Sequence, residues 1–257
     1  MCYNCKIMDK KFNTSFDNSA KYYDWASQSK VNKPFHFVVS RALFGIMAVK
    51  NGNFVSEIPE SVKQIKGPAV IASTHRSWLD IPYFVQATER ADLRYARPVA
   101  KDSLFKSNFL ALVFHKLGAV AVDRKQPNFE GINKSFGSFL DAGNSINAFT
   151  EGTRVKSDTR TVLQPKKTAF HLALRHEVPI VPLAIAGVAV DDKRSPLWFG
   201  KPIVAVMGSP IYLPPLIEGD DRTVQKFIFS QTREHLVELH IAQQTCLDEA
   251  YNIRDNY

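Results

Sequence analysis

The sequence predicts an α/β protein with a mostly parallel central sheet flanked by helices. From Lys66 onward, short apolar runs of the kind that form buried strands alternate with helical runs, which is typical of strand–helix–strand units. The chain has 257 residues, 45% of them hydrophobic and 23% charged, which is enough for one large domain with a substantial core. We therefore expect one main domain with a shorter segment at either end.

The first of these segments, residues 1–60, is expected to hold a polar stretch followed by an amphipathic helix. Within Phe35–Val49 the apolar residues recur at helical spacing, with Arg41 among them. Such a helix can pack on its own domain or lie in the interface of a membrane, and the pattern fits both. No apolar run is long enough for a spanning helix, and the N-terminal residues lack the apolar core of a signal peptide. If this segment binds a membrane, a helix on the membrane surface is therefore a better interpretation than a helix that spans it.

The main domain, residues 61–215, is predicted from its apolar runs. The expected strands are Ala69–Ser73, Tyr95–Ala100, Ala119–Val122, Ile146–Thr150, Ile180–Ala186 and Ile203–Met207. Apolar residues at helical spacing predict helices over Phe129–Leu140 and around Ala169–Ala173. A charged helix from about Asp221 to Ala250 forms the expected C-terminal extension, residues 216–257.

Charge and cysteine content narrow the classes of partner. The net charge of +8 favours an anionic partner, which can be nucleic acid, an acidic membrane surface or a phosphorylated substrate. No nucleic-acid-binding signature accompanies the charge, so nucleic acid is not expected as a partner. Cys2 and Cys5 have the spacing of half a zinc site, but no second pair completes it. The sparse cysteines fit a reducing compartment.

A histidine and an aspartate follow the first predicted strand of the main domain. His75 comes directly after the run that ends at Ser73 and Thr74, and Asp80 lies five positions further on. Ligand sites in open α/β sheets gather at the carboxyl ends of strands. There the imidazole can act as a general base, with the carboxylate orienting the ring and supporting its charged form. The same pair also fits a histidine bonded within a loop and an aspartate that caps a helix.

Ser77 raises the alternative of an acyl-enzyme formed on a Ser-His-Asp triad. It lies only two residues from His75 in the expected turn, whereas triads usually draw their members from distant segments. A triad that includes Ser77 is therefore not the preferred hypothesis.

Two arginines follow later predicted strands. Arg124 comes just after the strand that ends at Val122, and Arg154 closes the run Glu151-Gly152-Thr153-Arg154 after the next one. Arginine binds phosphate through a planar fork, and glycine lets backbone N–H groups approach an anion closely. Either arginine alone is better interpreted as a surface charge. Together with the His/Asp pair they suggest one pocket that holds a phosphate beside a base.

On these residues, the sequence resembles the glycerolipid acyltransferases, the family typified by lysophosphatidic acid acyltransferase. The resemblance runs over ordered blocks between about residues 60 and 215, which are His75–Asp80, Gly118–Arg124, Glu151–Arg154 and Val178–Leu183. The chain departs from the family pattern at Thr74, Thr150 and Thr168, where the family commonly has asparagine, proline and glycine. These departures border the expected pocket but leave its reactive groups in place.

The resemblance implies transfer of a fatty acyl group from acyl-CoA or acyl carrier protein to the hydroxyl of a glycerol-phosphate acceptor. The first choice of acceptor is 1-acylglycerol-3-phosphate, and glycerol 3-phosphate or another lysophospholipid are the alternatives. His75 would be the general base and Asp80 its orienting partner. Glu151 would order the loop or bond a glycerol hydroxyl, Gly152 and Thr153 would supply backbone approach and a hydroxyl, and the phosphate would be held by Arg124 and Arg154.

The resemblance also implies the partners of the chain. No metal or cofactor is expected, because a thioester is already activated. Lipid substrates would place the protein on the cytoplasmic face of a membrane with anionic lipids, which favours the interfacial interpretation of Phe35–Val49. A non-catalytic lipid-binding protein, or a thioesterase that uses the same base on water, remain the alternatives.

Overall fold

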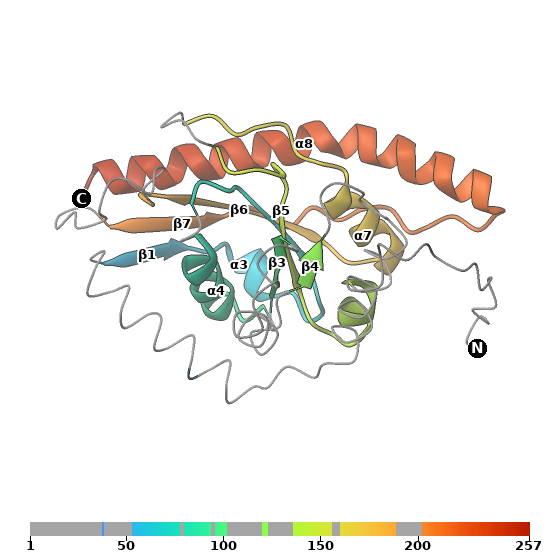
Figure 1. The fold of residues 1–257 in the computed structure, drawn as a ribbon, viewed down its shortest axis with the longest axis horizontal. Helices are drawn as coiled ribbons and strands as arrows, with labels where there is room; N and C mark the ends of the chain where they lie inside the picture. Colours follow the sequence, from blue (N-terminus) through green and yellow to red (C-terminus); the bar gives the residue numbers. More distant parts are fainter. Residues whose placement is uncertain are drawn as a thin grey trace.

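The computed structural model of the chain describes residues 38, 53–77, 80–93, 96–101, 120–122, 136–155, 160–188 and 202–257. The elements, in chain order, are β1 (Phe54–Glu57), α3 (Glu60–Lys63), β2 (Val70–Ser73), α4 (Asp80–Arg90), β3 (Arg97–Lys101), β4 (Val120–Val122), β5 (Ile146–Phe149), α7 (Thr168–His176), β6 (Ile180–Ala186), β7 (Ile203–Met207) and α8 (Asp221–Asp255). Residues 136–141 add a short helical segment. Figure 1 shows these elements arranged around one sheet.

The described strands form a single sheet in the order β1-β7-β6-β2-β5-β3-β4. The pair β6–β7 is antiparallel and the other neighbouring pairs are parallel, which confirms the predicted α/β class with a mostly parallel sheet. Strand β1 was not predicted. It pairs with β7 at the sheet edge, with Phe54 opposite Ile203, so the boundary expected at residue 60 has to move to a point before β1.

The predicted strands agree with the structure to within two residues at each end, and β6 and β7 have the expected bounds. Strand β6 is apolar and buried along its whole length because both faces of a parallel sheet are covered by helices. Helix α7 forms where it was predicted. Helix α8 begins at the predicted Asp221 and continues to Asp255, five residues beyond the expected end.

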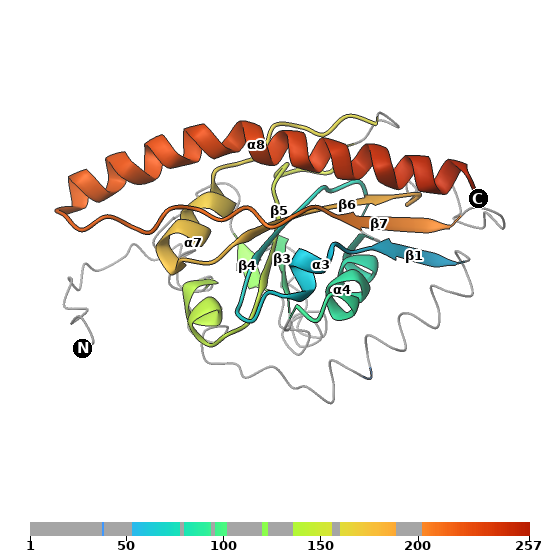
Figure 2. The ribbon, with the colours of Figure 1, turned by 180° about the vertical axis from the view of Figure 1, so that it is seen from behind.

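Each face of the sheet packs against its own set of helices. One face contacts α7, the segment 136–141 and α8, and its core includes Val70, Phe170 and Leu247. The opposite face contacts α3 and α4, with Ile71 and Phe84 in its core. Figures 1 and 2 show α8 lying along one side of the sheet, with α3 and α4 on the other. This layered packing fixes the strand ends from which the candidate site is built.

Several expected features lie outside the described residues. Of the expected N-terminal amphipathic helix, the structure describes only Val38, which is 62% exposed. The first part of the helix predicted over Phe129–Leu140 and the cysteines Cys2 and Cys5 are not among the described residues. None of the described helices combines the length and apolar character that crossing a membrane requires.

Candidate active site

The site lies at the carboxyl ends of β2 and β5. These two strands are parallel neighbours, with Ser73 opposite Phe149, so their ends meet at the same edge of the sheet. His75 follows β2 and Glu151 follows β5, each by two residues. The structure therefore brings together two segments that are 76 positions apart in the chain. Ligand sites of open α/β sheets occur at such strand ends.

His75 and Asp80 form a hydrogen-bonded pair. The ring nitrogen Nδ1 of His75 lies 3.1 Å from Oδ2 of Asp80. The same carboxylate oxygen accepts hydrogen bonds from the backbone N–H groups of Arg76 at 2.6 Å and Ser77 at 2.8 Å. All three donors precede helix α4, so the carboxylate closes the turn after β2 and does not act as the helix cap of the alternative interpretation. With Nδ1 donating to Asp80, the lone pair of the imidazole is on Nε2.

The carboxylate of Asp80 lies at the start of α4 and is buried beside the ring of His75. Asp80 is the first residue of α4, where the helix dipole stabilises negative charge. The side chain of Asp80 is 1% exposed and that of His75 is 10% exposed, so water screens their interaction only weakly. The ring of His75 also stacks on Phe149 of β5, with centroids 4.1 Å apart. The imidazole is thus held on one side by a carboxylate and on one face by an aromatic ring.

Glu151 holds the turn after β2 from the neighbouring strand. Its Oε2 accepts a hydrogen bond from the backbone N–H of His75 at 2.6 Å, and its Oε1 accepts one from the N–H of Leu163 at 2.9 Å. The guanidinium of Arg76 lies 3.9 Å from Oε1 and donates to the carbonyl of Thr161 at 2.8 Å. Both oxygens are engaged inside the protein, which supports the loop-ordering role expected for Glu151 over contact with a glycerol hydroxyl.

Burial dominates the ionisation of Glu151. The side chain has no exposed surface, and desolvation raises its pKa above the ordinary 4.5. The hydrogen bonds from Leu163 and His75 and the nearby charge of Arg76 lower the pKa, but by less than burial raises it. Sequence reasoning gave no role to Arg76, because nothing in its spacing shows that it lies beside Glu151.

The turn after Glu151 wraps around the backbone of His75. Gly152 has φ +69°, a left-handed conformation that favours glycine over other residues. Two residues beyond Thr153, the N–H of Val155 donates to the carbonyl of His75 at 2.9 Å. Gly152, Thr153 and Arg154 are exposed. Arg154 directly precedes Val155, the residue that bonds to His75. The turn therefore places Arg154 at the surface, close to the strand ends that carry His75 and Glu151. Arg124, the other predicted phosphate ligand, lies outside the described residues.

A buried glutamine of α8 contacts both β2 and the residue that follows β5. Nε2 of Gln243 donates to the carbonyl of Ala72 at 2.9 Å and lies 3.0 Å from the hydroxyl of Thr150. Gln243 is fully buried. Thr150 is one of the positions at which the chain departs from the pattern of the family it resembles. Sequence reasoning missed this contact, since Gln243 is 171 positions from Ala72 and sits in a helix read as a terminal extension.

Comparison with known proteins agrees with this fold. Residues 53–186 match the family described as Acyltransferase. The chain is 27% identical over 162 residues to 1-acyl-sn-glycerol-3-phosphate acyltransferase of Saccharomyces cerevisiae, covering 60% of this chain and 50% of that protein. The protein of the same description from Bacillus subtilis is 29% identical over 143 residues, which cover 56% of this chain and 66% of the relative.

A solved structure shares the architecture. The crystal structure of the 1-acyl-sn-glycerophosphate acyltransferase PlsC from Thermotoga maritima superimposes with a TM-score of 0.53 at 19% identity, covering 88% of this chain and 90% of that one. The chain belongs to the Acyltransferase family, which confirms the predicted family membership. His75, Asp80 and the run 151–154 all lie inside the matched residues 53–186, and Gln243 lies outside them. The chain spans one half to about two thirds of the length of these two sequence relatives.

Proposed function

We propose that the chain transfers a fatty acyl group from a thioester to the hydroxyl of 1-acylglycerol-3-phosphate, giving phosphatidic acid in phospholipid biosynthesis. The observation that carries the proposal is the contact of 3.1 Å between His75 Nδ1 and Asp80 Oδ2 at the end of β2. This contact leaves the opposite ring nitrogen to accept a proton. The family match and the descriptions of the relatives from yeast and Bacillus support the choice of reaction.

The reaction follows from these groups. Nε2 of His75 takes the proton of the acceptor hydroxyl while the oxygen attacks the carbonyl carbon of the thioester. The resulting imidazolium is stabilised by the carboxylate of Asp80, which is buried beside it. The tetrahedral intermediate then collapses, the carbon–sulfur bond breaks, and the imidazolium returns its proton to the leaving thiolate. Positioned general-base catalysis of this kind contributes typically about 10²- to 10⁴-fold to the rate.

The remaining groups orient the acceptor. The exposed guanidinium of Arg154 would hold the acceptor phosphate, with Arg124 as a second ligand. Binding of a phosphate remote from the reacting oxygen fixes the position of the hydroxyl and so lowers the entropic part of the barrier. Gly152 and Thr153 would offer backbone approach and a hydroxyl beside it. No metal or cofactor takes part in this scheme, because thioester cleavage supplies the driving force.

The donor would be acyl-CoA or acyl carrier protein, and the enzyme would work at the cytoplasmic face of a membrane that contains anionic lipids. The lipid acceptor and product both reside in the bilayer, which requires the protein to reach its surface. The net charge of +8 favours such a surface. Glycerol 3-phosphate and other lysophospholipids are the competing acceptors.

The test is incubation of the purified protein with labelled oleoyl-CoA or oleoyl-acyl carrier protein and a panel of acceptors, followed by chromatography of the lipids. The expected product is labelled phosphatidic acid, formed only when lysophosphatidic acid is present. Preferential labelling of another acceptor would replace the proposed substrate. Release of free fatty acid at the same rate with and without acceptor would identify a thioesterase and contradict the proposal.

A further inference from the structure

The N-terminal half of α8 has a surface that the proposed reaction does not use. The helix has 35 residues, so it is roughly 52 Å long at about 1.5 Å per residue. Its C-terminal half supplies Cys246, Leu247 and Ala250 to the core beside β6 and β7. The N-terminal half runs past α7 toward the end of the molecule (Figures 1 and 2). One side of it therefore faces outward along several turns.

Basic and apolar residues alternate along this outward side. The α8 stripe consists of Arg222, Lys226, Phe229, Arg233 and Val237, whose spacings of three and four residues place them on one face of the helix. All five are exposed, and Phe229 and Val237 keep 56% and 63% of their surface accessible. A helix face that combines basic residues with exposed apolar ones is typical of helices that bind at the surface of a membrane.

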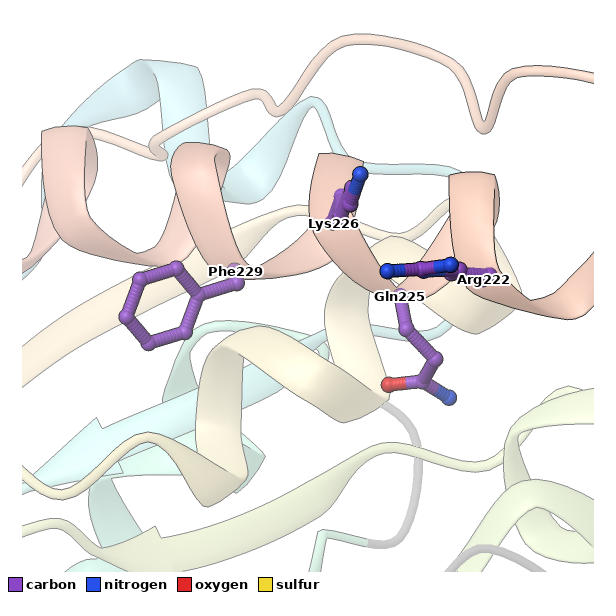
Figure 3. Close-up of a pocket in the computed structure, with 4 residues that line it drawn as sticks. All are labelled: Arg222, Gln225, Lys226 and Phe229. Atoms are coloured by element: carbon purple, nitrogen blue, oxygen red, sulfur yellow. The ribbon is translucent and has the colours of Figure 1, made fainter.

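The acidic residues of this part of the helix lie elsewhere on its circumference. Glu234 and Glu238 lie roughly 100° and roughly 140° from the mean direction of the stripe, at about 100° per residue. The first turn of the stripe borders an open hollow of about 570 Å³ lined by Arg222, Gln225, Lys226 and Phe229. Figure 3 shows these four side chains along one side of α8, with Gln225 extending toward the helix below it. The stripe thus presents positive charge and apolar surface, and Glu234 and Glu238 lie to one side of it.

The positive surface continues from the stripe to the candidate active site. The ammonium of Lys167 lies 4.6 Å from the centroid of the Phe229 ring. Its neighbour Lys166 lies against the turn after β5, where a Cβ placed on Gly152 would be 3.4 Å from Cγ and Cε of the lysine. Lys166 and Lys167 are both exposed. A flat anionic surface laid on the stripe would therefore also meet the lysines that border the turn carrying Arg154.

We propose that the α8 stripe docks the protein onto the surface of a bilayer that contains anionic phospholipids. Lysine and arginine side chains pair with lipid phosphates, while Phe229 and Val237 enter the boundary between headgroups and acyl chains, as in other basic amphipathic helices at interfaces. Charge complementarity selects a lipid surface, because the basic residues are spread over several turns rather than gathered in one pocket. The proposed function explains why the protein would bind a bilayer, but the binding itself does not require acyl transfer.

The experiment measures partition of the full-length protein onto sedimentable vesicles of phosphatidylcholine with and without phosphatidylglycerol, in the absence of acyl donor. The test variants are the double variant Arg222→Gln/Lys226→Gln and the single variant Phe229→Ser. The matched control, Lys63→Gln/Lys66→Gln, removes the same charge from exposed positions in and beside α3, which packs on the opposite face of the sheet. Circular dichroism and thermal unfolding check that every variant is folded.

The wild type is expected to bind anionic vesicles in a manner that weakens with added NaCl. The double stripe variant should lose about twenty-five-fold in partition, because each of the two basic residues contributes roughly fivefold at an anionic surface. Phe229→Ser should lower binding at all salt concentrations, and the α3 control should bind nearly as the wild type does. Equal partition of the stripe variants and the wild type, or an equal loss in the control, would overturn the proposal.

Two further readouts separate this proposal from its alternatives. Sedimentation equilibrium tests whether the stripe joins two copies of the chain, and a dimer dissociated by Phe229→Ser would overturn the lipid assignment. Turnover of a monodisperse short-chain lysolipid without vesicles should be the same in the stripe variants and the wild type. A wild type that binds vesicles through the stripe yet transfers no acyl group would refute the proposed function and support the docking surface.

Discussion

The hydrogen bond between Gln243 and Thr150 couples α8 to the strand ends that carry the candidate site. Nε2 of Gln243 lies 3.0 Å from the Thr150 hydroxyl and 2.9 Å from the carbonyl of Ala72, and both side chains are buried. The Thr150 hydroxyl also lies 3.2 Å from Oε1 of the same glutamine and 3.4 Å from the carbonyl of Ser73. We expect the two side chains to depend on each other strongly for their stabilising effect.

The perturbation is a double-mutant cycle with Gln243→Leu and Thr150→Val. Gln243→Leu keeps the volume but leaves the Thr150 hydroxyl and one acceptor site of Ala72 without this partner, which should cost about 2–3 kcal/mol. Thr150→Val leaves the buried amide with a single partner and should cost about 1–2 kcal/mol. The double variant removes both polar groups, so its cost should fall below the sum of the single costs by about 1 kcal/mol.

The assay is urea unfolding at equilibrium, compared at equal m-values. Thr245→Val serves as the control partner for Gln243→Leu, because Thr245 is an exposed threonine of the same helix and its hydroxyl donates to the carbonyl of Ile241 at 3.0 Å. That pair should be additive. Additivity of the Gln243 and Thr150 costs within about 0.3–0.5 kcal/mol would refute the coupling inferred from the structure.

Three further predictions concern the site itself. Asp80→Asn should lower kcat by about 10³- to 10⁴-fold with little loss of stability, since it retains an oxygen acceptor but no longer stabilises the imidazolium that forms during transfer. Steady-state kinetics and thermal unfolding measure the two effects, and a near-normal kcat would contradict the prediction. Arg154→Ala should raise the KM for the acceptor about tenfold or more and change that for the donor little, since it removes one ligand of the acceptor phosphate; equal changes in the two KM values would argue against a phosphate clamp. Burial raises the pKa of Glu151 above 4.5. Between pH 4.5 and the pKa of the folded state, the folded protein therefore binds more protons than the unfolded chain does. As the pH rises through this range, the free energy of unfolding of the wild type should fall relative to that of Glu151→Gln. Urea titrations at several pH values test this sign, and a difference that grows in favour of the wild type would contradict it.

The central strands could be predicted because their sequence and their environment agree. Strands β6 and β7 are apolar and buried at every position, so hydrophobic runs bounded by turns locate them well. Strand β1 lacks that pattern. Its residues Phe54–Glu57 are half-buried or exposed at the sheet edge, and they form a strand only because β7, nearly 150 residues away in the chain, offers an edge to pair with.

In the candidate site, too, contacts that are local in the sequence could be predicted and contacts between distant segments could not. His75 and Asp80 are five positions apart and meet within one turn, so their pairing could be predicted from spacing. The bonds of Glu151 to the His75 backbone and of Gln243 to Ala72 join residues 76 and 171 positions apart. No local pattern predicts such contacts, since they depend on strand order and on how α8 lies on the sheet. Predicting them requires the fold first.

The central claim is that His75 is the base that deprotonates the acceptor hydroxyl. The most direct measurement is the single-turnover rate of acyl transfer from oleoyl-CoA to lysophosphatidic acid by His75→Ala. The matched control is His176→Ala, which removes another histidine whose Nδ1 bonds to a carboxylate, that of Asp141 at 2.9 Å. We predict that His75→Ala stays folded and loses at least about 10²- to 10⁴-fold in rate, while His176→Ala transfers at close to the wild-type rate. A folded His75→Ala that transfers as fast as the control would contradict the account.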